Sequence, residues 1–116
     1  MAHLEYTLRG DADQFLTHLD SAILGRSITA SAEGGTDQRI GDARMVVRSY
    51  ERFGALGGNR VALTLSILAV GDELAVSAFG TGGSQAMFFK ANTLSESSFL
   101  GVAARAIESF PGQGDA

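Results

Sequence analysis

Residues 60–90 read RVALTLSILAVGDELAVSAFGTGGSQAMFFK and carry a clear strand pattern. Apolar side chains recur at every second position over residues 61–69, which is typical of a strand with one buried and one solvated face. Residues 70–73 reverse the chain, and the alternation resumes over residues 74–78. The stretch therefore predicts an antiparallel β-hairpin.

The end of this stretch predicts one more strand and a candidate binding turn. Residues 80–83 reverse the chain again, and residues 84–90 follow as a strand with an aromatic side chain on each face. Glycine amides and short polar side chains at such a turn can bind an anion. The predicted ligand-binding residues are Gly82, Gly83, Ser84 and Gln85. The lysine of a phosphate loop is absent, so a plain hairpin turn is the alternative interpretation.

A strand and a helix precede this region. Polar and apolar residues alternate over residues 4–9, which predicts a half-buried strand. Asp11 then occupies a helix N-cap position with Gln14 three residues later, and Gly25 provides a stop. The apolar stripe of the predicted helix consists of Phe15, Leu19, Ala22 and Ile23.

Two segments lie between this helix and the hairpin. Residues 27–33 alternate and predict a short strand that ends at Gly34. Residues 34–42 are rich in glycine and aspartate, which favours a turn or a mobile loop. Residues 43–53 predict another strand, with the odd-numbered side chains buried and the even-numbered side chains solvated.

The chain ends in a second predicted helix. Ser95 is its expected N-cap, and Glu96 is favourably placed against the helix dipole. Its expected buried stripe consists of Phe99, Val102, Ala103, Ala106, Ile107 and Phe110. Pro111 ends the helix, and residues 111–116 are expected to form a disordered tail.

Together these elements predict one α+β domain over residues 1–110, in the order β-α-β-β-β-β-β-α. An antiparallel sheet of about six strands, with both helices on the face of Leu63, Leu65 and Met87, satisfies short connections and buries one apolar surface. The arrangement resembles the helix-grip and TATA-binding-protein-like folds. Such folds host lipid binders, nucleic-acid binders and enzymes, so the architecture alone decides no function.

A narrower resemblance rests on three short motifs. Asn59, Arg60 and Val61 form the first, GGSQAMFFKANT at residues 82–93 the second, and Phe99 with Leu100 the third. These motifs resemble a family of small bacterial proteins catalogued only as a domain of unknown function. The resemblance implies no activity, cofactor or binding residue.

Composition excludes several function classes. The 116 residues include no cysteine, which rules out disulfides and thiolate chemistry. The net charge of −4 argues against a nucleic-acid partner. No long apolar run or basic leader is present, so the sequence predicts a cytoplasmic protein without a membrane segment.

The sequence predicts no metal, no cofactor and no catalytic residue. His3 and His18 lack the spacing of a metal-binding pair, and each is interpreted as a solvated or hydrogen-bonded side chain. A serine hydrolase would use Ser84 with one of these histidines, but no local signature joins them. The sequence therefore does not predict an enzyme.

A cluster of arginines provides another candidate site. Residues 39–60 contain five arginines against two acidic residues. The predicted anion or partner face consists of Arg44, Arg48, Tyr50, Arg52, Phe79 and Phe88. The alternative interpretation is a solvated face whose arginines pair with carboxylates such as Glu33 or Glu73.

Two functions remain open at this point. The first is an interaction module that forms a homodimer through the open sheet face, with an apolar surface at Leu68, Val70, Phe79 and Phe88. The second is a helix-grip binding protein for a small apolar or anionic ligand. Its expected pocket is lined by Phe15, Leu65, Met87, Phe89 and Phe99.

Overall fold

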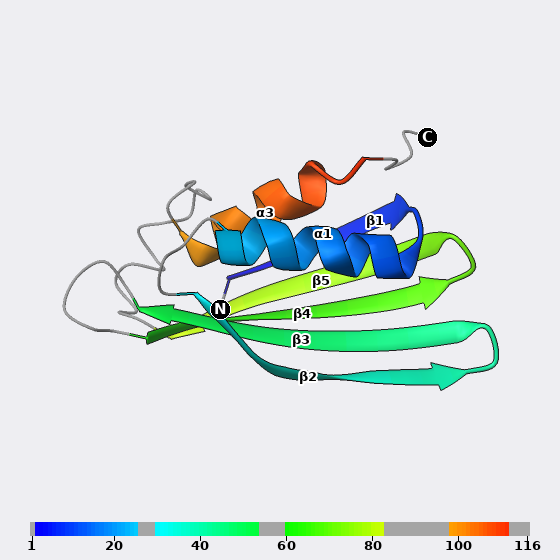
Figure 1. Cartoon of the computed structure of the whole chain (residues 1–116), viewed down its shortest axis with the longest axis horizontal. Coiled ribbons are helices and arrows are strands. Elements are labelled where there is room, and N and C mark those ends of the chain that lie inside the picture. Colours follow the sequence, from blue (N-terminus) through cyan, green and yellow to red (C-terminus); the bar gives the residue numbers. More distant parts are fainter. Residues whose placement is uncertain (1, 26–29, 54–59, 83–97, 112–116) are drawn as a thin grey trace.

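A computed structural model describes residues 2–25, 30–53, 60–82 and 98–111. Five strands form one sheet in the order β1-β5-β4-β3-β2, and every neighbouring pair is antiparallel. Both helices lie on the same side of this sheet (Figure 1), which confirms the predicted α+β class. The elements are β1 (Ala2–Arg9), α1 (Ala12–Gly25), β2 (Ser31–Ile40), β3 (Ala43–Phe53), β4 (Arg60–Val70), β5 (Glu73–Gly82) and α3 (Phe99–Glu108).

The central hairpin is confirmed. β4 and β5 pair with Leu65 opposite Ala78, and Gly71 and Asp72 form the turn between them. Gly71 has φ 62°, a left-handed conformation that glycine adopts without steric cost. The side chains that the alternation assigned to the core are buried on the helix-covered face, except Val61 at the start of β4, which is partly buried. The further strand predicted at residues 84–90 lies outside the described residues.

β3 directs its even-numbered side chains toward the helices, so the predicted orientation of this strand is wrong. Val46 and Tyr50 are buried, whereas Met45 and Phe53 are exposed on the opposite face. Tyr50 stands opposite Leu63 of β4, which fixes the face that they share. The prediction failed because the same face carries three arginines. Carboxylates from other elements pair with Arg44 and Arg48, and Arg52 contacts the Phe99 ring.

β2 is one continuous strand, where the sequence predicted a short strand and then a loop over residues 34–42. All ten of its residues are exposed, so no apolar alternation marks it, and main-chain pairing with β3 defines it. A register shift between Ala32 and Gly34 marks a bulge. At Gly35 a Cβ atom would lie 2.0 Å from the Val47 carbonyl oxygen, so this close approach requires glycine.

The helix starts show one correct and one incorrect N-cap. The Asp11 carboxylate accepts a hydrogen bond of 3.0 Å from the Gln14 amide, as predicted for α1. For α3 the cap is Ser98, whose hydroxyl oxygen accepts from the Gly101 amide at 2.8 Å, so the predicted cap at Ser95 is wrong. Several serines precede this helix, and the one that caps it directly precedes the first buried residue, Phe99.

Gly10 joins β1 to α1 with φ 157°, and the Phe110 ring packs against it. A Cβ atom at this position would lie 2.6 Å from the ring. We expect Gly10→Ala to lower the free energy of unfolding by about 1–3 kcal/mol in a denaturant titration, because the backbone is strained and the ring must shift.

Gly25→Ala is the matched control for this substitution. No atom lies within 4 Å of a Cβ built at Gly25, so the expected change is neutral or stabilising by up to about 1 kcal/mol. Equal losses in the two variants would contradict the role of Phe110 packing at Gly10.

No helix in the described part of the chain is long and apolar enough to cross a membrane.

Candidate functional site

Arg44 of β3 joins three elements on the helix-covered side of the sheet. It donates a 2.9 Å hydrogen bond to Asp13 of α1 and bonds of 2.9 and 2.7 Å to Asp37 of β2. Only 12% of its side chain is exposed. These carboxylates, Asp37 foremost, raise the pKa of Arg44, and Arg44 in turn lowers the pKa of Asp37. The arginine thereby ties the edge strand β2 to the first turn of α1.

A second cluster lies about two helical turns further along α1. Asp20 of α1 accepts hydrogen bonds of 2.9 and 2.7 Å from Arg48 and one from the Tyr50 hydroxyl group. Burial, and then the hydrogen bond to Asp20, raise the pKa of Tyr50. The hydrogen bond from Arg48 to Asp20 raises the pKa of this arginine. Sequence analysis missed Asp13 and Asp20, although a spacing of seven residues places them on one face of a helix.

Arg52 completes the row of arginines beside α3. Its guanidinium group lies 4.7 Å from the centre of the Phe99 ring, a cation–π contact. Burial lowers the pKa of Arg52. An anion that approaches the predicted arginine face would therefore compete with contacts that the protein already makes to these side chains. The role of these arginines as an anion-binding face stays a prediction.

Phe79 lies on the other face of the sheet, so the structure does not bring it together with the arginines. It stands opposite Thr64, is 37% exposed, and stacks on His3 with ring centres 5.8 Å apart. Phe88, which the sequence placed in the same group, lies outside the described residues. The predicted partner face is thus divided between the two sides of the sheet.

The helix-free face carries a cluster of exposed apolar side chains at the end where the two hairpins turn. Met45 stands opposite Leu68, and Val70 stands opposite Ala43, which in turn pairs with Ile40. We call the four large side chains the open-face patch: Ile40, Met45, Leu68 and Val70, all exposed.

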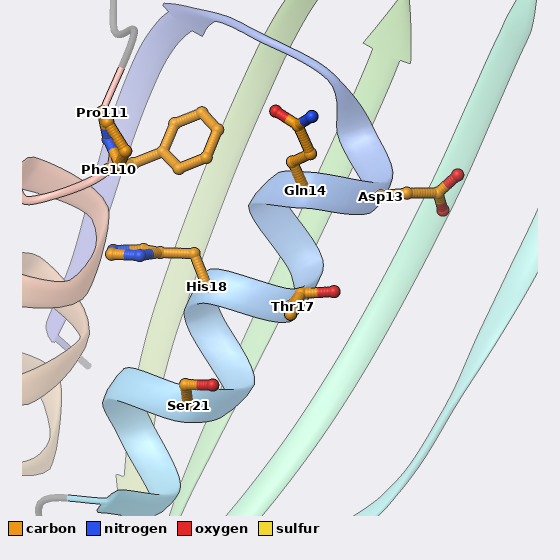
Figure 2. Close-up of a pocket in the computed structure, with 7 residues that line it drawn as sticks. All are labelled: Asp13, Gln14, Thr17, His18, Ser21, Phe110 and Pro111. Atoms are coloured by element: carbon orange, nitrogen blue, oxygen red, sulfur yellow. The ribbon is translucent and has the colours of Figure 1, made fainter.

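A groove runs along the outer surface of α1 beside the end of α3 (Figure 2). Its volume is about 470 Å³. The residues that line it are Asp13, Gln14, Thr17, His18, Ser21, Phe110 and Pro111. Figure 2 shows the His18 ring directed from α1 toward the segment that carries Phe110.

The hydrogen bonds of His18 fix its tautomer. Nε2 lies 2.8 Å from the Ala106 carbonyl oxygen and 3.0 Å from the Ser109 hydroxyl oxygen. A carbonyl oxygen only accepts hydrogen bonds, so Nε2 carries the hydrogen. The Ser109 hydroxyl group itself donates to Ala106 over 3.1 Å. In this arrangement His18 cannot act as a base toward Ser109, because Nε2 has no lone pair available.

The remaining candidates are dispersed. His3 is on β1 and His18 on α1, and no three His, Cys, Asp or Glu side chains among the described residues gather as a metal site. Of the predicted ligand-binding turn, only Gly82 is described, as the last residue of β5. Gly83, Ser84 and Gln85 lie outside the described residues, and their role stays a prediction.

The fold and its surfaces define a small α+β domain in which two helices cover one face of a five-stranded antiparallel sheet. The model of a family of unknown function, DUF6054, matches residues 1–111. The chain belongs to this family. The match agrees with the resemblance to a domain of unknown function and assigns no role to the three motifs that suggested it. No curated protein matches the chain.

Proposed function

We propose that this protein is an interaction module that self-associates through the helix-free face of its sheet. The observation that supports the proposal is the open-face patch, in which large apolar side chains of neighbouring strands are exposed together. Contiguous apolar surface on a protein marks an interaction site. The molecule measures 45 by 28 by 24 Å, so this face has room for the roughly 800 Å² that each partner buries in a standard interface.

Charge favours a second copy of the chain as the partner. Two chains of net charge −4 repel each other unless they meet through an uncharged surface. The cross-strand row of Met45 and Leu68 contains no charged residue. The row of Ile40 and Val70 ends in Glu73 and Arg9, which pair with each other at 3.7 Å and so leave no net charge. A two-fold axis through such a neutral surface brings no like charges together.

A small-molecule binder is the second of the two functions and has less support. Phe15, Leu65 and Phe99, three of the five residues expected to line its pocket, belong to one buried hydrophobic cluster. Met87 and Phe89 lie outside the described residues. The groove beside His18 is on the outer side of α1, away from the expected pocket between the helices and the sheet.

The test is the mass of the protein in solution. We expect light scattering at micromolar concentration to give at least twice the chain mass of 12.1 kDa, and Leu68→Asp to lower that mass. A buried carboxylate without a partner opposes the contact. Ser21→Asp adds the same charge to the exposed surface of α1 and should leave the mass unchanged. A wild-type protein of 12.1 kDa, or a Leu68→Asp variant with the same mass as the wild type, would overturn the proposal.

A further inference from the structure

β2 forms one edge of the sheet, and its residues are exposed on both faces. No strand from the rest of the described chain pairs with its outer edge. Such an edge presents unpaired backbone N–H and C=O groups, a template on which another strand can pair. We propose that β2 pairs antiparallel with β2 of a second copy, so that one sheet continues across both chains. This inference concerns the outer edge of β2, shares only Ile40 with the open-face patch and does not depend on that patch.

Symmetry limits the registers that such a pair can adopt. A two-fold axis perpendicular to the sheet keeps the helices of both copies on one side, and side chains alternate between the faces of a strand. One residue of β2 must therefore stand directly opposite the same residue of the second copy, and the axis lies midway between these two residues. Centred on Asp37, the axis would place two carboxylates directly opposite each other. Centred on Thr36, it would place Asp37 opposite Gly35. Centred on Gln38, it places Asp37 opposite Arg39 of the second copy.

The charges of the edge favour the register centred on Gln38. Arg39 stands opposite Arg44 in the β2–β3 pair, and within the described residues it forms no hydrogen bond or salt bridge. Asp13, Asp37 and Arg44 form a cluster with one net negative charge. Arg39 of the second copy would neutralise this cluster, and the two-fold axis makes the same contact twice. Opposite charges directly across antiparallel strands stabilise the pair.

The side chains of β2 on the helix-free face also fit the register centred on Gln38. Gln38 meets Gln38 of the second copy, and a side-chain amide both donates and accepts hydrogen bonds. Ile40, which is 85% exposed, meets Thr36. The bulge at Ala32 and Gly34 lies beyond the paired segment and does not interrupt it. Because Gln38 is next to Met45, the Met45 rows of the two copies line up across the axis, with the two glutamine side chains between them.

Single cysteines test this register directly, because the chain contains none of its own. Directly opposite residues in an antiparallel pair have Cβ atoms roughly 4.5–5.5 Å apart, close to the roughly 3.5–4.5 Å of a disulfide. We expect Gln38→Cys to form a covalent dimer under mild oxidation. Thr36→Cys, on the same face of the same strand, should stay at the mass of one chain on a non-reducing gel.

Two further variants separate this contact from association through the open-face patch. Arg39→Glu should abolish the cross-link of Gln38→Cys, since it places two carboxylates opposite each other, whereas Leu68→Asp should leave the cross-link intact. The inference is overturned if Gln38→Cys does not cross-link, if Thr36→Cys cross-links equally well, or if Arg39→Glu has no effect. An edge covered by a peptide or by another segment of the same chain would give no cross-link with either cysteine.

Discussion

Leu65→Ala is expected to lower the free energy of unfolding by about 2–5 kcal/mol. Leu65 has no exposed surface and lies in the middle of β4, between Arg48 of β3 and Ala78 of β5. Backbone pairing on both sides holds the strand in place, so the surrounding structure cannot collapse into the space that the truncation leaves. A denaturant titration monitored by circular dichroism measures the loss.

Leu68→Ala removes the same atoms from the same strand on the opposite face. Leu68 is 45% exposed in the single chain, so at protein concentrations that dissociate the proposed assembly its truncation should change the free energy of unfolding by less than about 1 kcal/mol. The difference between the two variants measures burial on the helix-covered face. Similar losses at both positions would show that the open face is also covered in solution, and a loss below about 1 kcal/mol at Leu65 would contradict the core described here.

The two tyrosines of the chain should remain neutral at pH values where ordinary tyrosines ionise. Burial, and then a 2.8 Å hydrogen bond to Glu108, raise the pKa of Tyr6 to about 12. Burial and the hydrogen bond to Asp20 also raise the pKa of Tyr50. In the unfolded chain both tyrosine hydroxyl groups ionise at about pH 10. The ultraviolet absorbance of tyrosinate follows both titrations, because the chain contains no tryptophan.

The same shifts make the protein less stable in alkaline solution. A pKa that is higher in the folded state means that the unfolded chain loses its proton first as the pH rises. The stabilising contribution of Tyr6 is therefore complete below pH 10 and is lost as the pH rises through 12. Tyr50→Phe should leave a single tyrosine that ionises near pH 12. Full tyrosinate absorbance at pH 10 in the folded wild-type protein would contradict this prediction.

The alternation of apolar and polar residues predicts a strand that buries one face, and it does not predict a strand that buries neither face. In β4 and β5 the alternation of side chains follows burial, so the hairpin, its turn and its core face could all be read from the pattern. β2 has no buried side chain, and its strand conformation depends on main-chain pairing with β3. Such pairing is a tertiary interaction that leaves no periodic signal in composition.

The orientation of β3 and the partners of its arginines needed the tertiary structure. Arg44 and Arg48 look solvated in the sequence, but carboxylates of α1 pair with them on the helix-covered face. Asp13 and Asp20 repeat on the helix as the arginines repeat on the strand, and recognising this match requires knowledge that α1 lies over β3. The open-face patch was predicted at Leu68 and Val70, whereas Met45 became part of it only through the inverted orientation of β3.

The position of β1 at the edge next to β5 has a consequence for synthesis on the ribosome. β1 is made first, yet it pairs Arg9 with Glu73 and Ala2 with Gly80, more than 60 residues later in the chain. At about 5–20 residues per second, translation delays this pairing by roughly 3–12 s. During that time the apolar stripe of α1 has neither the finished sheet nor α3 to cover it. A nascent chain stalled before β5 should therefore bind chaperones that recognise exposed apolar segments, and a chain that has released α3 should not.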